Sequence, residues 1–364
     1  MSTVSLVRCA DYNFQQTYKA VKAAIGLVGG IDKFVLPGQK VLIKPNLLRA
    51  ARPDEAVTTH PEFVRAVIRV FKEKETQIFV GDSPAGLVKI DAVYEKCGIT
   101  QVCREEKVNL VKFDRIIEIN GIPFAELLRQ VDVCVSLPKF KTHNLTTITA
   151  GVKNVFGFIP GLYKVYCHKQ APNHREFSSL IAKIYGMVRP HLTILDAIEA
   201  MDGDGPSSGR PIKIGLVLAA SDAVALDSVI SKIVGLNAGD VVSTREAYKL
   251  GLGEADIAKI NIVGEKIGEV LAAGFKPPRI AKLFKLPNII SRTILKVIPL
   301  VIGIDRKRCN LCFMCKNSCP QQAIILASDK LSINPQRCIL CFCCGEVCPN
   351  NAIYIRFLNR RRQE

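Results

Sequence analysis

Cysteine is the residue type whose spacing in this chain most clearly predicts chemistry. Nine of the fourteen cysteines lie between Cys309 and Cys348, in two blocks that repeat each other: RCNLCFMCKNSCPQQAI begins at Arg308 and RCILCFCCGEVCPNNAI at Arg337. Each block has the pattern C-x-x-C-x-x-C-x-x-x-C-P, in which three thiolates hold one cubane and the fourth reaches a second cubane. The repeat therefore predicts an internally duplicated domain with two [4Fe-4S] clusters.

The crossed pattern assigns four thiolates to each cluster. The first predicted set is Cys309, Cys312, Cys315 and Cys348, and the second is Cys338, Cys341, Cys344 and Cys319. A disulfide network is the alternative, but the chain opens without a basic and apolar export signal, so we expect reducing conditions and a cytoplasmic location. The spacing also favours a cubane over a single tetrahedral zinc ion.

The remaining cysteines fall outside these sets. Cys343 lies inside the second block and is interpreted as a non-ligand, with ligand exchange during oxidation as the alternative. The others are scattered and are expected to be small buried apolar residues. They are Cys9, Cys97, Cys103, Cys134 and Cys167.

Residues 304–358 resemble bacterial-type two-cluster ferredoxins. The chain departs from their pattern at Met314 and Cys343, where those ferredoxins often carry a small residue beside the third cysteine. The resemblance implies a small, duplicated α+β ferredoxin-like domain that stores and passes single electrons. Such a domain does not determine which molecule is reduced, so we expect residues 1–275 to determine the substrate.

Residues 1–275 alternate short apolar runs with amphipathic stretches, a pattern typical of a parallel α/β sheet with helical crossovers. The predicted strands are Val41–Ile43, Gln77–Val80, Val131–Leu137, Leu192–Leu195 and Ile212–Ala219. The predicted helices include Phe14–Leu27 and Pro61–Lys74. The sequence thus predicts a parallel-sheet α/β module followed by the ferredoxin-like domain.

Polar residues follow each predicted strand. The carboxyl ends of parallel strands share one edge, where ligands bind, so we expect these residues to converge there. They are Lys44, Asn46, Asp82, Lys139, Lys141, His143, Asp196 and Asp222. In an extended segment Lys139, Lys141 and His143 share a face, and the threonine-rich stretch after Asn144 is predicted to open a helix whose free amides bind anions.

The lysines at this edge favour an anionic ligand. Lys44, Lys139, Lys141 and Lys153 lie at strand ends or beside glycines, although for any single lysine a solvated loop is the alternative. The loop Glu199–Pro211 could bind a divalent cation or a polar substrate, but turn chemistry also explains its composition.

Two aspartates and the histidines complete the candidates. Asp222 is predicted to face the ligand, whereas Asp227 on the next helix is interpreted as a structural hydrogen-bonding residue. No pair of histidines has metal-binding spacing on a helix, although His143 and His168 could meet in space.

These stretches resemble the domain of unknown function 362 family. The resemblance rests on KPNLL, GDSPAG, LPKFKTH with GVKNVFG, YCHK, MDGDGPSSG and SDAVALD. The resemblance implies that members of this family frequently carry a C-terminal two-cluster ferredoxin domain, and it implies no particular reaction. Its motifs support as site residues Lys44, Asn46, Asp82, Lys139, Lys141, His143, Lys153, Asn154 and Asp196.

Two functions of different class follow. In the first, favoured here, the protein is an oxidoreductase whose clusters exchange electrons between a cytosolic partner and an anionic substrate or cofactor. Lys141, His143, Lys153 and Asp196 would then be catalytic, and Lys44, Asn46, Asp82, Lys139, Asn154 and Asp222 would bind the ligand. In the second, the protein transfers electrons or assists cofactor or cluster assembly by docking a partner, without catalysis. No glycine-rich dinucleotide motif follows a predicted strand.

Nearly half of the net charge of +17 lies between Lys276 and Arg308, in the predicted linker, residues 276–303, and the residues just after it. This pattern favours an interdomain connection, with peripheral contact to an anionic membrane or an acidic partner as the alternative. No base-stacking platform accompanies it, so a nucleic-acid partner is not expected. No run of about 18 uncharged apolar residues occurs, so no transmembrane span is expected.

Overall fold

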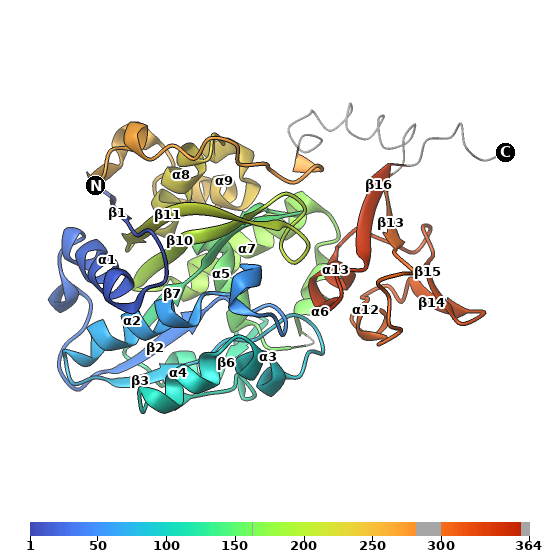
Figure 1. The fold of residues 1–364 in the computed structure, drawn as a ribbon, viewed down its shortest axis with the longest axis horizontal. Helices are drawn as coiled ribbons and strands as arrows, with labels where there is room; N and C mark the ends of the chain where they lie inside the picture. Colours follow the sequence, from blue (N-terminus) through green and yellow to red (C-terminus); the bar gives the residue numbers. More distant parts are fainter. Residues whose placement is uncertain (162, 282–299, 358–364) are drawn as a thin grey trace.

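The computed structural model describes residues 1–161, 163–281 and 300–357. Most of the predicted basic linker, residues 282–299, therefore lies outside the described residues. Figure 1 shows a large α/β part, residues 1–281, beside a smaller ferredoxin-like part, residues 300–357, drawn in red. Of the helices in the described ranges, none combines the length and apolar character needed to cross a bilayer.

The α/β part is built on one ten-stranded sheet, with the order β12-β1-β11-β10-β7-β2-β3-β4 and with β8 and β9 attached through β10. Its strands are β1 (Thr3–Arg8), β2 (Lys40–Pro45), β3 (Gln77–Val80), β4 (Asn109–Leu110), β7 (Val133–Leu137), β8 (Lys139–His143), β9 (Thr147–Thr149), β10 (Leu192–Asp202), β11 (Arg210–Ala220) and β12 (Asn261–Gly264). A separate hairpin pairs β5 (Ile116–Ile119) with β6 (Ile122–Ala125). The predicted α/β fold class is confirmed.

The direction of β11 differs from the prediction of a parallel sheet. β11 is antiparallel to both of its neighbours, β10 and β1, while the other pairs on the main path of the sheet are parallel. β10 and β11 are joined by residues 203–209, a connection too short for the crossover that a parallel pair needs. The sheet is therefore mostly parallel, and the carboxyl end of β11 lies at the opposite edge from the others.

Helices cover both faces of the sheet (Figure 1). One face carries α1 (Phe14–Leu27), α2 (Pro61–Lys72), α3 (Ile90–Lys96) and α4 (Ile99–Glu105), and the other carries α5 (Gly151–Asn154), α6 (Tyr163–Gln170), α7 (His174–Val188), α8 (Ala223–Ile233) and α9 (Val242–Lys249). Alternation along the strands divides the core, since Val41 and Ile43 pack toward α1 and α2 while Leu42 packs toward α5 and α7.

The segment after β7 departs from its predicted helix. The threonine-rich stretch turns back as β9 and pairs with β8, so that His143 lies opposite Thr147. Helix α5 begins only at Gly151. The prediction of a helix directly after Asn144 was wrong, because β-branched threonines on a buried ribbon pack well as a strand. The amides of Gly151 and Val152 donate to Asp227, at 2.6 and 3.1 Å, which confirms the structural role expected for that aspartate.

The ferredoxin-like part has internal twofold character. It contains β13 (Leu300–Ile304), α12 (Met314–Asn317), β14 (Ile324–Ala327), β15 (Lys330–Ile333), α13 (Cys343–Val347) and β16 (Ile353–Phe357). β13 starts four residues before the predicted domain boundary at 304 and pairs with β16. Left-handed backbone conformations recur at equivalent places of the two blocks, at Leu311 and Leu340 and at Phe313 and Phe342. The repeat seen in the sequence is thus also a repeat of backbone shape.

Candidate functional site

The structure brings the predicted cluster cysteines together in two separate cavities. One is lined by Cys309, Cys312, Cys315 and Cys348, together with apolar residues that include Ile304, Leu331 and Ile353. The other is lined by Cys319, Cys338, Cys341 and Cys344, together with Ile302, Ile324 and Ile333. Each cavity combines three thiols of one block with the last cysteine of the other, as the crossed pattern requires. The donor set and the apolar lining fit a cubane in each cavity.

The hydrogen bonds around the last cysteine of each block are duplicated too. The amide of Ala323 donates to Cys319 Sγ and the amide of Ala352 donates to Cys348 Sγ, both at 3.2 Å. Hydrogen bonds to sulfur are one of the means by which proteins tune cluster potentials. Among the described residues no three Cys, His, Asp or Glu side chains converge closely enough to hold a single metal ion. In a cubane each thiolate binds a different iron, so wider spacing suits that cofactor.

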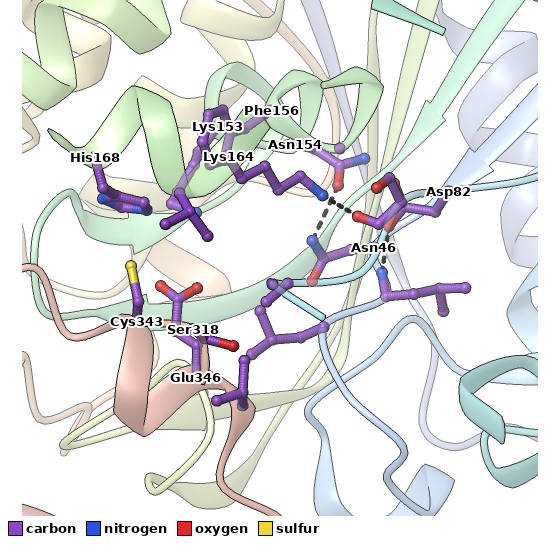
Figure 2. A pocket seen from close by; sticks show the side chains of 18 residues that line it. Asn46, Asp82, Lys153, Asn154, Phe156, Lys164, His168, Ser318, Cys343 and Glu346 are labelled. Carbon is purple, nitrogen blue, oxygen red and sulfur yellow. Dashed lines mark hydrogen bonds between the residues drawn. The ribbon is translucent and has the colours of Figure 1, made fainter. Parts of the chain in front are cut away.

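A pocket lies where the two parts meet, and we call it the interface pocket (Figure 2). Both parts contribute to its wall. The α/β part supplies, among others, Asn46, Asp82, Ser83, Lys153, Asn154, Lys164 and His168, and the ferredoxin-like part supplies Ser318, Cys343, Glu346 and Val347. The pocket therefore contains four of the predicted site residues: Asn46, Asp82, Lys153 and Asn154.

Lys44 lies behind the pocket wall in a buried network. Its ammonium is 2.7 Å from Asp82 Oδ1 and donates to Asn154 Oδ1 at 3.2 Å, and its side chain is fully buried. Burial lowers the pKa of Lys44, and the charge of Asp82 opposes that shift. A Cβ at position 157 would overlap Asp82 and Lys44, so Gly157 leaves room for this ion pair. Lys44 is therefore neutralised within the protein and is not available for an external anion.

Lys139 and Asp196 form a second buried ion pair, outside the interface pocket. Lys139 Nζ lies 3.0 Å from Asp196 Oδ2 and 2.6 Å from the hydroxyl of Tyr12, which donates to Asp196 Oδ1 at 2.7 Å. The ring of His60 stacks on Tyr12 at a centroid distance of 3.6 Å. β10 continues past Asp196, so this residue is inside a strand rather than at its end. The structure thus separates Lys139 and Asp196 from the pocket where they were expected.

Lys141 and His143 share the buried face of β8, as the extended alternation predicts, but neither lines the interface pocket. Lys141 Nζ donates to the backbone carbonyl of Val57. Burial lowers the pKa of Lys141 well below its ordinary value. Both side chains are therefore buried, but outside the lining of the pocket.

His143 joins the two parts of the molecule through Glu346 on α13. Its Nε2 lies 3.0 Å from Glu346 Oε1, while its Nδ1 accepts from the amide of Leu145 at 3.1 Å. An accepting Nδ1 assigns the ring proton to Nε2, so the imidazole donates to the carboxylate. Burial lowers the pKa of His143 to about 3. Although burial alone would raise it, the pKa of Glu346 is held below its usual range by this hydrogen bond and the charge of Lys153.

Two lysines, Lys153 and Lys164, give the interface pocket its positive groups. Lys153, on α5, lies near Glu346 and Cys343, and burial lowers its pKa. Lys164, on α6, donates to the carbonyls of Ser83 and Pro84. Burial lowers the pKa of Lys164 to about 7.

His168 is a buried polar residue of the pocket wall, with a ring nitrogen left unpartnered by the residues that the structure describes. Its side chain is 3% exposed and its ring stacks on Phe177 at a centroid distance of 4.2 Å. Its Nδ1 is buried and has no hydrogen-bond partner among the described residues. Burial lowers the pKa of His168 to about 4, so the ring is neutral at physiological pH. A buried ring nitrogen without a partner is costly, and a hydrogen-bonding group of a ligand in the pocket would satisfy it.

The prediction that Asp222 shares this site was wrong. Because β11 is antiparallel, Asp222 lies at the other edge of the sheet and caps α8, accepting from the amides of Val224 and Ala225. In the loop Glu199–Pro211, the two aspartates are each paired with an arginine. Asp202 lies 2.6 Å from Arg210 and Asp204 lies 3.2 Å from Arg279.

Several residues of the pocket wall were not among the predicted site residues. Lys164 and His168 belong to the YKVYCHK stretch, where a lysine and a histidine four residues apart on a helix share one face. That periodicity was a usable signal. Glu346 and Cys343 carried no comparable signal, because only the packing of the ferredoxin-like part against β8 and α6 brings them to the site.

Comparison with known proteins agrees with both halves of this description. The family model described as domain of unknown function (DUF362) matches residues 41–232, and the 4Fe-4S dicluster domain model matches residues 301–349. A thylakoid-associated protein of Synechocystis sp. is 31% identical over 302 residues, which cover 80% of this chain and 94% of that protein. The dicluster match supports an iron-sulfur protein with at least one [4Fe-4S] cluster.

Two solved structures show more distant similarity. The lactate racemase apoprotein of Thermoanaerobacterium thermosaccharolyticum has a TM-score of 0.39 and 14% identity, covering 62% of this chain and 56% of that one. A protein from Thermotoga maritima has a TM-score of 0.36 and 12% identity, covering 65% and 58%. The chain thus spans less than two thirds of either structure. From the family model and the identity to the Synechocystis protein, the chain belongs to the DUF362 family and carries a 4Fe-4S dicluster domain at its C-terminal side.

Proposed function

We propose that this protein is a two-cluster iron-sulfur oxidoreductase that exchanges electrons with an anionic small molecule held in the interface pocket. The observation that carries the proposal is the position of Cys343. It lines the interface pocket, while its neighbours Cys341 and Cys344 line the cavity assigned to the second cluster. Consecutive Cα atoms are about 3.8 Å apart, so a ligand in the pocket would lie close to that cavity.

The chain's own residues would perform the remaining tasks at this site. Lys153 and Lys164 would bind the anionic group, and the unpartnered Nδ1 of His168 would form a hydrogen bond with the ligand. Glu346 lies on the opposite, ferredoxin-like wall, so the anionic end of the ligand would be directed toward the two lysines. When bound, the clusters would store and supply single electrons, drawn from an external donor or passed to an acceptor.

Lys153 provides the first test of this site. Replacing Lys153 with alanine removes a charge-assisted contact worth about 1.5 to 3 kcal/mol, so the affinity for a bound dicarboxylate should fall about tenfold to hundredfold. Adipate, phosphate and nucleotides would be titrated into anaerobic protein while the thermal unfolding midpoint is followed. Lys169→Ala is the control, because Lys169 is an exposed lysine on α6. Equal stabilisation of wild type and Lys153→Ala by every anion would refute the binding site.

The lowered pKa of Lys164 provides a second test. Because its pKa is about 7, Lys164 is charged below that pH and neutral above it. Adipate stays doubly ionised above about pH 6.5. Its affinity should therefore fall by about tenfold between about pH 6.5 and pH 8.5, as the ammonium loses its proton. In Lys164→Met the affinity should be lower and nearly independent of pH, measured by isothermal titration calorimetry. A pH dependence that persists in Lys164→Met would assign the titration to another group.

A further inference from the structure

We propose that the surface around Cys312 is the docking site of an acidic one-electron carrier protein. This inference rests on the proposed function and names the partner with which the protein exchanges electrons. Of the eight cysteines that line the two cluster cavities, Cys312 alone is exposed, whereas its equivalent in the second block, Cys341, is 8% exposed. The first cavity thus has one of its thiols at the molecular surface, where a second protein can approach it.

The two blocks also differ in charge just before their first cysteine. Residues 305–308, which we call the basic turn, continue from Asp305 with Arg-Lys-Arg, and all three basic side chains are exposed. The equivalent of these three residues in the second block, residues 335–337, is Pro-Gln-Arg, and it forms a turn as well. The turn therefore folds without the first two charges. The block with the exposed cysteine carries two more positive charges than its backbone requires.

Hydrogen bonds hold the basic turn beside the first cavity. The amide of Cys309 donates to the carbonyl of Asp305 at 3.0 Å, and the side-chain amide of Asn350 donates to the carbonyl of Arg308 at 3.1 Å. Cys309 and Asn350 both line that cavity. Asp305 lies 3.6 Å from the guanidinium of Arg308, so its charge offsets only one of the three basic residues. The turn keeps a net positive charge next to the exposed cysteine.

The surroundings of the basic turn fit a protein partner with acidic character. Tyr354, on β16, is 41% exposed and lines a pocket together with Arg308, and tyrosine and arginine are enriched in protein interfaces. Residues 300–357 contain seven Lys/Arg and three Asp/Glu, and one of these three, Glu346, is buried. An acidic protein is therefore the partner whose charge complements this surface.

The docking site gives the two cavities different tasks. The second cavity is next to the interface pocket, because Cys341 and Cys344 flank Cys343. The first cavity is next to the docking site through Cys312. One electron would pass between the carrier and the first cavity at a time, with the carrier oxidised and the protein reduced, or the reverse. No bond forms or breaks in this step. The second cavity would connect the first one with the interface pocket.

Plant-type [2Fe-2S] ferredoxin and cytochrome c are suitable probes, since both are small one-electron carriers, the first acidic and the second basic. Association with anaerobic, cluster-loaded protein would be measured by surface plasmon resonance in about 0.03 M and about 0.3 M NaCl. We expect the association rate constant of ferredoxin to fall about tenfold with the added salt, and cytochrome c not to bind. In Arg306→Gln/Lys307→Gln the rate constant at the lower salt should fall about fivefold.

Lys330→Gln/Arg337→Gln is the matched control, because it removes two exposed positive charges from other places of the ferredoxin-like part. It should associate with ferredoxin nearly as wild type does. Both double variants should keep the iron content and the EPR spectrum of the wild type, since none of the four side chains is a cluster ligand. Association that is independent of salt, equal losses in the two double variants, or binding of cytochrome c as tight as that of ferredoxin would overturn the docking site.

Adipate separates this proposal from the proposed function. Binding of adipate that depends on Lys153, in protein whose association with ferredoxin does not depend on the basic turn, would overturn the docking site alone. Association with ferredoxin that depends on the basic turn, in protein that binds no anion, would support the docking site and overturn the proposed function of the interface pocket.

Discussion

Replacing Cys319 with serine is expected to lower the iron content of anaerobically purified protein from about eight to about four atoms per chain. Cys319 belongs to the first cysteine block, yet it lines the cavity of Cys338, Cys341 and Cys344 from the second block. The lost EPR signal of the reduced protein should therefore be that of the cluster held by the second block. Iron analysis, acid-labile sulfide and EPR spectroscopy measure the outcome.

Two other variants sharpen this experiment. Cys348→Ser should remove the opposite cluster, because Cys348 lines the cavity of Cys309, Cys312 and Cys315. Cys343→Ser should retain both clusters, because Cys343 lines neither cavity. If Cys319→Ser instead damaged the cluster of its own block, or if bound zinc replaced iron and sulfide in anaerobic wild type, the crossed assignment would be wrong.

Breaking the buried pair of Lys44 and Asp82 is expected to give the largest loss of stability. Lys44→Met leaves the carboxylate of Asp82 buried without its countercharge, and removing one partner of such a pair costs about 3 to 5 kcal/mol. The loss should appear in the free energy of unfolding of the α/β part, measured by urea titration and far-UV circular dichroism. The double variant Lys44→Met/Asp82→Leu should recover most of the loss, since no isolated charge then remains buried.

The pair of Lys112 and Asp91 is a matched control for this experiment. Its charged atoms are also 2.7 Å apart, but the two side chains are 48% and 76% exposed. An exposed ion pair contributes about 1 kcal/mol or less, so Lys112→Met should change the free energy of unfolding little. If Lys44→Met changed the free energy of unfolding as little as Lys112→Met, the Lys44 side chain would have to be uncharged in the folded protein.

Local patterns predicted the local structure well. Helix α1 covers the predicted residues Phe14–Leu27, with Asn13 capping it by accepting from the amides of Gln15 and Gln16, and β3 covers the predicted residues Gln77–Val80. These elements follow from periodicity and end signals that lie within a few residues of each other. The cysteine sets could be predicted for the same reason, because their spacing is itself a local pattern.

The site was harder to predict because its chemistry depends on partners distant in the sequence. Lys44 and Lys139 were expected to hold an external anion, but each is neutralised by a carboxylate that the fold brings to it, Asp82 and Asp196. The direction of β11 decided the position of Asp222, and strand direction is not visible in an apolar run. Glu346 became part of the site only through packing between the two parts of the chain.

If the proposed ligand binds there, the two-sided wall of the interface pocket would link its binding to the association of the α/β part with the ferredoxin-like part. A molecule that contacts Lys164 on one side and Glu346 on the other has its full set of contacts only when these two surfaces are together. By thermodynamic reciprocity, whatever tightens the association raises the ligand's affinity, and the bound ligand tightens the association by the same factor. Under the proposed function, an empty site would then receive electrons less readily than an occupied one, because nothing would bridge the two surfaces.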